Sequence, residues 1–314
     1  MKIQKSIILG IETSCDETSV AIVKNGREVL ACKIASSIPL HQETKGVVPE
    51  VAARAQIEYM IPVLDSALQK ANISWEHIDL ISVTQEPGLI GSLLVGISTA
   101  NILSLIHNIP IVGVPHIWGH MYANLLDNND TISFPALVLT VSGGHNDLYL
   151  WKSHGEFKKL GETLDDASGE AFDKCGRLLG LPYPAGPEVS KLAENGNPNA
   201  YNLPRPMLSS DNYHFSFSGL KTAFLYMLEK IKKPFDKKTS SDLAASLQEA
   251  ICETLWKKTE KALKEFHVKE VHLSGGVSAN NRLRQLFKDK LKDKKVDFKY
   301  PKNTLYCTDN AAMI

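Results

Sequence analysis

The sequence carries no excess charge of either sign. Its 314 residues include 35 Lys and Arg against 35 Asp and Glu, so the net charge at pH 7 is zero. A protein that binds nucleic acid over much of its surface has a basic excess, so any such contact here must come from local patches. With 43% hydrophobic and 22% charged residues, the chain has a globular composition and enough length for two domains of about 150 residues.

Cysteine is scarce and poorly placed for cross-linking. The five cysteines are odd in number and widely spaced, and no C-x-x-C pair occurs. This pattern excludes a zinc ribbon and argues against a disulfide framework, so we expect reduced thiols of the cytosolic kind. The cysteines are Cys15, Cys32, Cys175, Cys252 and Cys307.

Long apolar runs are also missing. The N-terminal apolar run is too short for a signal peptide and ends at Glu12. The most apolar region, residues 88–118, is interrupted by polar residues such as Ser92 and Asn101, whereas a membrane span needs about 20 nearly unbroken apolar residues. We therefore expect a buried helix followed by a strand there, a cytoplasmic location and no membrane partner.

Hydrophobic periodicity predicts strands that alternate with helices, which is typical of an α/β protein. Residues 6–14 and 18–26 read as a hairpin around a polar turn, and 27–36 as a third strand. A helix over 49–71 begins with Pro49, and Pro62 is expected to kink it. The other elements predicted in the first half are strands over 78–88 and 109–115 and helices over 89–107 and 116–126.

The same plan restarts at residue 135. Residues 135–153 read as strand, small polar turn and strand, and 156–164 as a third strand. This predicts an internal duplication of an α/β fold with a cleft between the halves. The predicted domains are 1–132, with 303–314 packing back on it or at the cleft and ending in a helix, and 133–302. Further predictions are helices over 169–180, 187–194, 240–266 and from 278, a loop over 195–214 and a strand over 269–276.

Small residues gather in three turns that follow strands. Glycine lets a backbone approach a ligand closely, and successive N–H groups can bind phosphate oxygens. One such turn is usually structural, but three in a duplicated context favour a nucleotide or another phosphate ligand. A P-loop enzyme is excluded because G-x-x-x-x-G-K-[ST] is absent, and G-x-G-x-x-G is absent too. The turns are GIETSCDETS at 10–19, VSGGHND at 141–147 and LSGGVSANNRLR at 273–284.

The stretch HIWGH places His116 and His120 four residues apart. On a helix they share a face and could hold one metal ion, although a lone pair of this kind is more often incidental. A metalloprotease has the same spacing with a glutamate after the first histidine as general base. Here that position is Ile117, which argues against water activation and is compatible with group transfer.

Taken together, these motifs point to one group of proteins. A phosphate hairpin in each half and a late SGGVSANNRLR resemble the actin, Hsp70 and sugar-kinase superfamily of duplicated, ribonuclease H-like ATPase domains. Within it, the chain resembles the tRNA N6-adenosine threonylcarbamoyltransferase family, once described as a sialoglycoprotease, over essentially its whole length. The matching stretches include GIETSCDETSVAIV, GVVPEVAARAQ, PGLIGSLLVG, HIWGH, VSGGH, DDASGEAFDKCGRLLGLPYPAGP, FSFSGLKTA, LSGGVSANNRLR and CTDNAAMI.

The resemblance implies a metal site. Asp309 in CTDNAAMI would join His116 and His120 on one divalent ion, which the family suggests is Fe²⁺, with Zn²⁺ and Mn²⁺ as alternatives. Some relatives add a tyrosine at the position of Thr140, so no fourth protein ligand is expected here. No catalytic residue is implied beyond these ligands.

The resemblance also implies an adenine-nucleotide site for threonylcarbamoyl-adenylate, AMP or ATP. Asp173 would hold ribose hydroxyls, Gly186 would allow close approach, and Asn280 would contact adenine; Asp173 could equally cap a helix or form an ordinary salt bridge. Relatives often have glycine at Ala185 and an acid at Ser190. The full set is Thr140, Val141, Ser142, Gly143, Gly144, Asp173, Gly186 and Asn280, with Asp16, Glu17 and Ser190 as secondary candidates.

The implied reaction moves the threonylcarbamoyl group from threonylcarbamoyl-adenylate to N6 of adenosine 37 in tRNAs that read codons starting with A, and releases AMP. Implied partners are tRNA, an inactive paralogue of the same fold and, in bacteria, a small P-loop ATPase. Lysine clusters at 230–238 and 288–295 are candidate tRNA contacts. Helices over 49–71 and 90–107 are candidate dimer surfaces, and burial of their apolar residues in the core is the equal alternative.

Three other readings remain open at this level. A small-molecule kinase of the same superfamily would turn over ATP and would not need the two histidines. A metalloendopeptidase is disfavoured by the missing glutamate, and a regulatory scaffold is disfavoured because the inactive paralogue lacks metal residues that this chain has.

Overall fold

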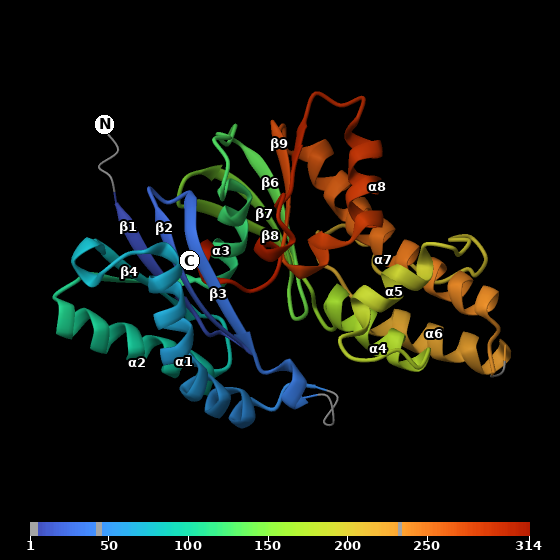
Figure 1. The fold of residues 1–314 in the computed structure, drawn as a ribbon. Coiled ribbons are helices and arrows are strands. Elements are labelled where there is room, and N and C mark those ends of the chain that lie inside the picture. The colour runs from blue at the N-terminus through green and yellow to red at the C-terminus, as the bar shows by residue number, and fades with distance from the viewer. Residues whose placement is uncertain (1–5, 42–45, 232–233) are drawn as a thin grey trace. The chain divides into compact units, whose positions relative to one another are not determined.

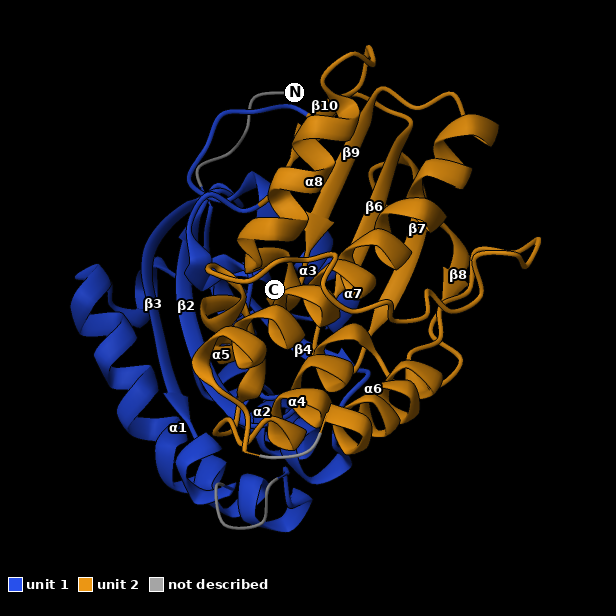
Figure 2. Ribbon diagram, turned by 90° about the vertical axis from the view of Figure 1, so that its right-hand side faces the viewer, with its two compact units in different colours: residues 1–131, 301–314 blue, residues 132–300 orange. Residues whose placement is uncertain are grey.

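The fold is described from a computed structural model. The description covers residues 6–41, 46–231 and 234–314. The chain divides into two compact units, unit 1 with Met1–Thr131 and Pro301–Ile314, and unit 2 with Ile132–Tyr300. Figure 1 labels the elements and Figure 2 colours the two units.

Unit 1 contains a five-stranded mixed sheet with the order β3-β2-β1-β4-β5. The first three strands are antiparallel, and β4 and β5 run parallel to β1. Their alternating or continuous apolar residues predicted these strands correctly. The strands are β1 (Ile7–Glu12), β2 (Glu17–Lys24), β3 (Glu28–Ser36), β4 (Leu80–Glu86) and β5 (Ile111–Pro115).

Helices α1 (Pro49–Ala71), α2 (Ile90–His107) and α3 (His116–Tyr122) complete unit 1. The first begins with Pro49 and continues through Pro62, and Asn72 ends it in the left-handed conformation. Buried side chains of α1 and of strands β1 and β4 form one core, which includes Leu9, Ile81 and Leu64. Helices α1 and α2 lie side by side along the sheet (Figure 1).

The prediction that the 89–107 segment is a buried helix is wrong in part. The helix exists, but only Ser92, Leu93, Gly96 and Ala100 are buried. Leu105 is 84% exposed and Ile90 is 78% exposed. The helix carries apolar residues on all of its faces. Hydrophobicity alone therefore could not show which face packs on the sheet.

Unit 2 repeats the sheet of unit 1. Its strand order is β10-β9-β6-β7-β8, with β6, β7 and β8 antiparallel and β9 and β10 parallel to their neighbours. The prediction of a duplicated α/β fold is therefore confirmed. The strands are β6 (Ala136–Val141), β7 (Asn146–Ser153), β8 (Glu156–Glu162), β9 (Glu270–Ser274) and β10 (Asp297–Lys299).

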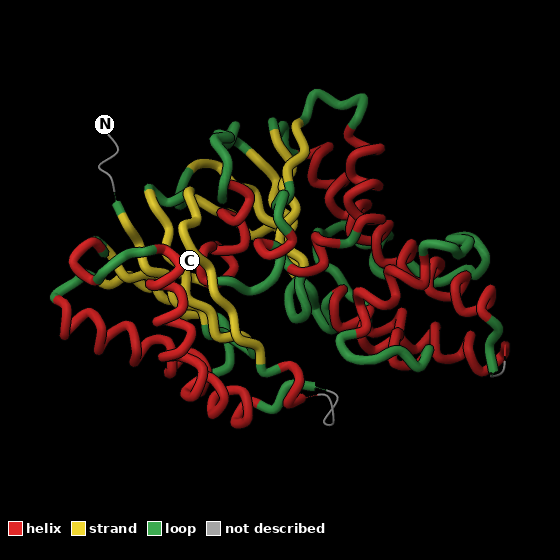
Figure 3. Tube along the Cα trace, in the orientation of Figure 1, coloured by secondary structure: helices red, strands yellow, loops and turns green. Residues whose placement is uncertain are grey.

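The helices of unit 2 form a large core with the buried faces of β6, β7 and β9, and Figure 3 shows how they follow the strands along the chain. The short strand β10 was not predicted, because a three-residue strand gives a weak periodic signal. Helix α6 was not predicted either, although its buried residues Leu220, Phe224 and Leu228 have helical spacing. The helices are α4 (Ser168–Leu178), α5 (Ala185–Ala193), α6 (Ser218–Ile231), α7 (Lys237–Glu265) and α8 (Asn281–Leu291).

The last residues form 3₁₀ turns and not the expected helix. These turns cover Thr304–Tyr306 and Ala311–Met313. They belong to unit 1, where Tyr306, Ala311 and Met313 pack with Ala21 and Val23 of β2 in a small apolar cluster. The apolar residues of these turns are thus buried against β2, in a segment where a helix was predicted.

Candidate metal centre and nucleotide-binding turns

Three potential metal ligands meet in unit 1. Helix α3 begins directly after β5, so the first turn of the helix starts at the carboxyl end of that strand. His116 and His120 lie on one face of α3, and their ring centroids are 4.6 Å apart. Both Nε2 atoms point at one carboxylate oxygen: Asp309 Oδ1 is 3.5 Å from His116 and 3.2 Å from His120. One ligand atom from each residue lies within 4.8 Å of the others.

Close backbone packing brings Asp309 to the histidines. A Cβ on Gly10 of β1 would lie 2.2 Å from the carbonyl oxygen of Ala311, and a Cβ on Gly119 of α3 would lie 2.8 Å from Ile314 Cδ1. The Ala311 N–H also donates to Ser19 Oγ at 2.9 Å. The glycine inside HIWGH therefore makes room for the chain end, whose turn carries Asp309.

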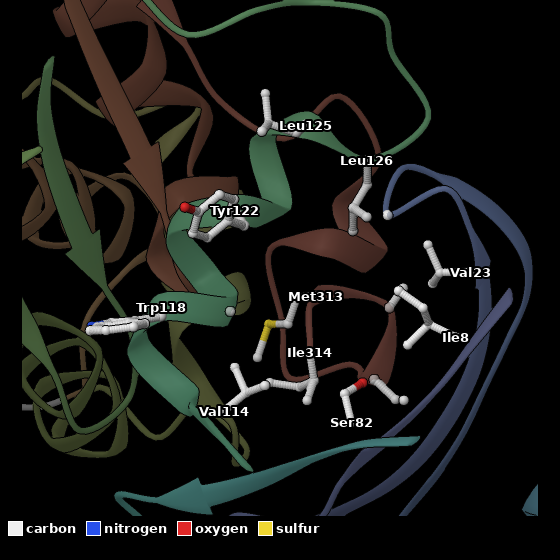
Figure 4. A pocket seen from close by; sticks show the side chains of 15 residues that line it. Ile8, Val23, Ser82, Val114, Trp118, Tyr122, Leu125, Leu126, Met313 and Ile314 are labelled. Atoms are coloured by element: carbon white, nitrogen blue, oxygen red, sulfur yellow. The ribbon is translucent and has the colours of Figure 1, made fainter. Parts of the chain in front are cut away.

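An apolar cavity of about 230 Å³ lies beside this turn in unit 1. Figure 4 shows Met313 and Ile314 extending into it, with Trp118 and Tyr122 of α3 along one side. Its lining is aliphatic and aromatic, unlike the donor set of the histidine cluster. None of the three candidate metal ligands, His116, His120 and Asp309, lines the cavity.

The histidine cluster suits a divalent cation. His120 is fully buried, and its Nδ1 has no hydrogen-bond partner among the described residues. Burial lowers the pKa of His120, which keeps a neutral imidazole available as a ligand. Burial alone would also lower the pKa of His116, but the charges of Asp309 and Glu12 raise it to about 9. A cation among these groups would take the place of that proton.

Glu12 is a component of the site that the sequence analysis missed. It ends β1, is 1% exposed, and its Oε2 lies 3.1 Å from His116 Nδ1. Its charge is stabilised in spite of burial, since His116 lowers the pKa of its carboxyl. An acid at the end of an otherwise apolar strand was the available signal, but it was interpreted only as the end of an apolar run.

The secondary candidate Asp16 lies in the β1–β2 turn, and Glu17 is the first residue of β2. Gln56 of α1 holds this turn by donating to the carbonyls of Cys15 and Glu17, both at 3.0 Å. Burial, followed by the charge of Asp16, raises the pKa of Glu17 to about 10. Neither acid belongs to the His116, His120 and Asp309 cluster found among the described residues.

In unit 2, the predicted phosphate turn is open only at its tip. Thr140 and Val141 are fully buried in β6, and Thr140 Oγ1 lies 2.9 Å from Ser274 Oγ. Their predicted contact with a nucleotide stays a prediction. Gly143 and Gly144 are exposed, and a Cβ on either would meet nothing within 4 Å. The exposed part of this segment is thus the turn itself, which begins after Val141.

The carbonyls of this turn already cap α4. Gly169 N donates to Ser142 O and Glu170 N donates to Gly143 O, both at 3.2 Å. These two amides of the helix N-terminus are consequently unavailable to a phosphate. Ser142 N also donates within the turn, to His145 O at 2.8 Å. The N–H groups of Gly143 and Gly144 remain the donors of interest.

Four other predicted residues meet around α5. Asp173 Oδ1 accepts from Ala185 N at 2.7 Å and Gly186 N at 3.0 Å, so the helix-capping reading of Asp173 is correct for one oxygen. Asn280 Nδ2 donates to Ser190 Oγ at 2.8 Å. Since Gly186 and Ser190 are four residues apart on α5, they share a face.

Asn280 has little hydrogen-bonding capacity left. Its second amide hydrogen serves Gln248 Oε1 at 2.8 Å, and its Oδ1 caps α8 by accepting from Leu283 N at 2.9 Å. An amide has two donors and one oxygen acceptor with two lone pairs. A ligand could therefore use one lone pair of Asn280 without breaking these bonds.

Comparison with solved structures identifies the class of fold. The chain resembles HypF from T. kodakarensis with a TM-score of 0.62 at 14% identity, over 98% of this chain and 46% of that chain. It resembles component A of the (R)-2-hydroxyglutaryl-CoA dehydratase of Acidaminococcus fermentans with a TM-score of 0.53 at 18% identity, over 98% and 96% of the two chains. At these identities the likeness shows the fold alone, which is the duplicated actin-like ATPase fold.

Sequence comparison identifies the family. The model of tRNA N6-adenosine threonylcarbamoyltransferase matches residues 28–314. Proteins of that name from Bacillus subtilis (strain 168) and Geobacillus kaustophilus (strain HTA426) are 50% and 48% identical, over 98% of this chain and 88% and 89% of theirs. The chain belongs to the tRNA N6-adenosine threonylcarbamoyltransferase family.

Proposed function

We propose that the protein transfers a threonylcarbamoyl group from threonylcarbamoyl-adenylate to N6 of adenosine 37 in tRNAs that read codons starting with A. One observation carries the proposal: His116, His120 and Asp309 converge within 4.8 Å in a chain of this family. The small-molecule kinase alternative gives no reason for two buried histidines to face one carboxylate. The endopeptidase alternative lacks the glutamate that follows the first histidine in H-E-x-x-H, a position that Ile117 occupies here.

The reaction is an acyl transfer with a defined balance. The N6 amine attacks the carbamoyl carbon, a carbon–nitrogen bond forms, and the bond from that carbon to the phosphate oxygen breaks. Its electron pair leaves with AMP, and the amine loses one proton to the departing phosphate or to water. Because an exocyclic adenine amine is a weak nucleophile, positioning of both substrates must supply much of the rate enhancement.

The metal-binding residues are His116, His120 and Asp309. A divalent metal held there would supply Lewis-acid stabilisation of negative charge, and Fe²⁺, Zn²⁺ and Mn²⁺ all accept imidazole and carboxylate ligands. Ile117 is 7% exposed and lies between the two histidines in sequence. An apolar side chain there supplies no general base for hydrolysis, which would otherwise destroy the activated carbamate.

For the nucleotide we propose unit 2. The N–H groups of Gly143 and Gly144 would bind phosphate oxygens, and the second carboxylate oxygen of Asp173, Oδ2, would accept from ribose hydroxyls. A Cβ on Gly186 would be 3.7 Å from Phe172 Cβ and 3.9 Å from Asp173 Oδ1, which are ordinary contacts. Since the ligand-free chain would tolerate alanine there, any need for glycine comes from the ligand.

For partners we propose tRNA, a paralogue of the same fold and a small P-loop ATPase, in the cytoplasm. The exposed apolar side chains of α1 and α2 support a protein contact: Ile57 is 65% exposed, Ile106 is 67% exposed and Leu105 is 84% exposed. Among the described residues, one helix, α2, is long and apolar enough to cross a membrane. One of its faces packs on β4 and α1, so a partner helix is the better match for its other face.

For tRNA contact we propose the end of α8 and the following turn. Lys288, Lys290 and Lys292 are exposed there, and Arg284 and Lys288 lie over the ring of Tyr300 at 4.4 and 5.1 Å from its centroid. The other predicted cluster, 230–238, lies partly outside the described residues, since 232 and 233 are not covered.

Transfer of labelled threonine tests the proposal. The assay incubates the full chain with threonylcarbamoyl-adenylate and an ANN-decoding tRNA transcript, with and without the two proposed partner proteins, and compares wild type with His116→Ala. We expect modified adenosine with wild type and a loss of at least about 100-fold with the variant. His272→Ala, at a buried histidine of unit 2, is a matched control.

Two results would contradict the proposal. Hydrolysis of ATP with phosphate transferred to a small molecule, and no modified adenosine with any partner combination, would favour the kinase reading. Equal product from wild type and His116→Ala would remove the metal role that the histidine cluster supports.

A further inference from the structure

A buried carboxylate lies on the side of His116 away from Asp309. Glu12 Oε2 is 3.1 Å from His116 Nδ1, and the opposite ring nitrogen, Nε2, lies 3.5 Å from Asp309 Oδ1. The imidazole is thus held between two carboxylates, one at each nitrogen. Glu12 is 1% exposed and His116 is 4% exposed, so water does not compete for this contact.

Glu12 is itself held by two donors. Ser14 N donates to its Oε1 at 2.5 Å, and Thr84 Oγ1 donates to its Oε2. These bonds fix the carboxylate so that Oε2 faces the imidazole. The orientation therefore depends on backbone and side-chain donors and not on a flexible surface contact.

The sheet topology explains why these residues meet. Strands β1, β4 and β5 are adjacent and parallel. Glu12 is the last residue of β1, Thr84 lies near the end of β4, and His116 follows β5 directly. Carboxyl ends of neighbouring parallel strands share one edge of a sheet, so residues separated by up to 104 positions become neighbours.

We propose that Glu12 is a positioning residue for the metal centre. By accepting the Nδ1–H of His116, it selects the tautomer whose Nε2 lone pair faces the ligand cluster, and it fixes the plane of the ring. A carboxylate in this place also makes the imidazole a stronger donor to a cation. The inference rests on the metal site of the proposed function and adds a residue to it.

Glu12 does not serve as a fourth ligand in this arrangement. Its oxygen faces Nδ1, and the two nitrogens of an imidazole direct their lone pairs away from each other. His120 differs from His116, because no described residue partners its Nδ1. The two histidines are therefore unequal, and only His116 has its tautomer imposed by a charged neighbour.

Metal binding by the intact chain tests this role without relying on catalysis. Metal-free wild type, Glu12→Gln and Thr84→Val would be titrated with Co²⁺ and Zn²⁺ in competition with a chelator, and the visible spectrum of bound Co²⁺ recorded. Glu270→Gln is the matched control, since Glu270 lies 2.8 Å from His272 in a buried pair of unit 2. Thermal unfolding of each metal-free variant reports stability separately.

We expect Glu12→Gln to weaken metal binding about 10- to 100-fold and to alter the Co²⁺ spectrum. Thr84→Val should do so to a smaller extent, and Glu270→Gln should change neither property even where it lowers stability. Wild-type affinity and spectrum in Glu12→Gln would overturn the inference. So would an affinity loss in Glu270→Gln that matches its loss of stability, because the effect would then be general destabilisation.

This test is separable from that of the proposed function. Metal binding that follows the expected order, without any transfer to tRNA, would refute the transferase and leave the role of Glu12 standing. Transfer activity with unchanged metal binding in Glu12→Gln would refute the role of Glu12 alone.

Discussion

Each unit of the chain has a buried glutamate–histidine pair, and the two pairs differ in what surrounds them. In unit 1, Glu12 contacts one nitrogen of His116, and the other nitrogen faces Asp309 and His120. In unit 2, Glu270 pairs with His272 at 2.8 Å, and Lys299 Nζ lies 3.0 Å from the same carboxylate.

The comparison shows what turns such a pair into a candidate metal centre. In unit 2 the positive charge of Lys299 already neutralises Glu270, and the described residues supply no second histidine or acid. In unit 1, His120 and the carboxylate of Asp309, whose side chain is 24% exposed, lie near Nε2 of His116. A cluster of donors around one point, and not a buried pair by itself, defines the site.

The largest expected effect is a loss of metal affinity when a candidate ligand of unit 1 is removed, compared with removal of a buried histidine of unit 2. His120→Ala should lower metal affinity by about 10³-fold or more, because a few ligands share a binding free energy of about 10–16 kcal/mol in structural zinc sites. His272→Ala, equally buried, should lower only stability. Chelator competition and metal content after dialysis measure the affinity. Equal metal retention by both variants would contradict the claim that His120 is a metal ligand and His272 is not.

Two glycines, Gly10 in unit 1 and Gly143 in unit 2, differ in how closely they are packed. Gly10→Ala would place a Cβ 2.2 Å from Ala311 O, whereas Gly143→Ala meets nothing within 4 Å. We expect Gly10→Ala to lower the free energy of unfolding by about 1–3 kcal/mol and also to weaken metal binding, since the displaced turn carries Asp309.

Gly143→Ala should leave stability within about 0.5 kcal/mol of wild type and weaken only nucleotide binding. Denaturant unfolding and AMP titration separate the two cases. A large stability loss in Gly143→Ala would show that the turn of unit 2 is as tightly packed as that of unit 1.

The pair in unit 2 predicts a pH dependence. Burial alone would raise the pKa of Glu270, but hydrogen bonds from His272, Ser133 and Lys299 lower it from its ordinary 4.5 to about 2. A lowered pKa in the folded state stabilises the protein above pH 4.5, and this stabilisation is lost as the pH falls towards 2.

Glu270→Gln should therefore cost about 1–3 kcal/mol at pH 7, and the difference from wild type should shrink between pH 4.5 and pH 2. Urea unfolding over this range is the measurement. A constant difference at all pH values would mean that the charge of Glu270 does not stabilise the fold.

The smallest expected effect on the isolated chain concerns α2. Leu105→Glu replaces a side chain that is 84% exposed and should change the free energy of unfolding by less than about 0.5 kcal/mol. It should weaken binding to the proposed paralogue at least about tenfold, because a charge would be buried at the contact. Sedimentation of the mixture measures this, with Lys264→Glu, at an exposed position on α7 of unit 2, as the control for added negative charge.

Much of the fold could be predicted from local pattern. The hairpin of β1 and β2, the helix that begins at Pro49 and the restart of the plan at residue 135 all follow from periodicity and turn residues. The exposed side of α2 could not be predicted, because the helix is apolar all round and only packing distinguishes its faces. Helix α6 was missed, since its start depends on Asp165, which accepts from Phe217 N and Ser218 N across 52 and 53 residues.

The candidate site divides in the same way. His116 and His120 are four residues apart, so helix geometry alone puts them on one face, and family motifs added Asp309 from far along the chain. The burial of Thr140 and Val141 and the engagement of Asn280 in three hydrogen bonds could not be foreseen. Those outcomes depend on which neighbours compete for the same donors and acceptors.

By itself, then, the sequence determined the strands and helices, the duplicated plan and the histidine pair, because each depends on spacing within a few turns or strands. Only the tertiary structure decided that Glu12 supports His116, that Gly10 and Gly119 admit the chain end, and that the phosphate turn opens only at its tip. These are contacts between segments up to 301 positions apart, such as Gly10 and Ala311, and they exist only once neighbouring parallel strands align their carboxyl ends.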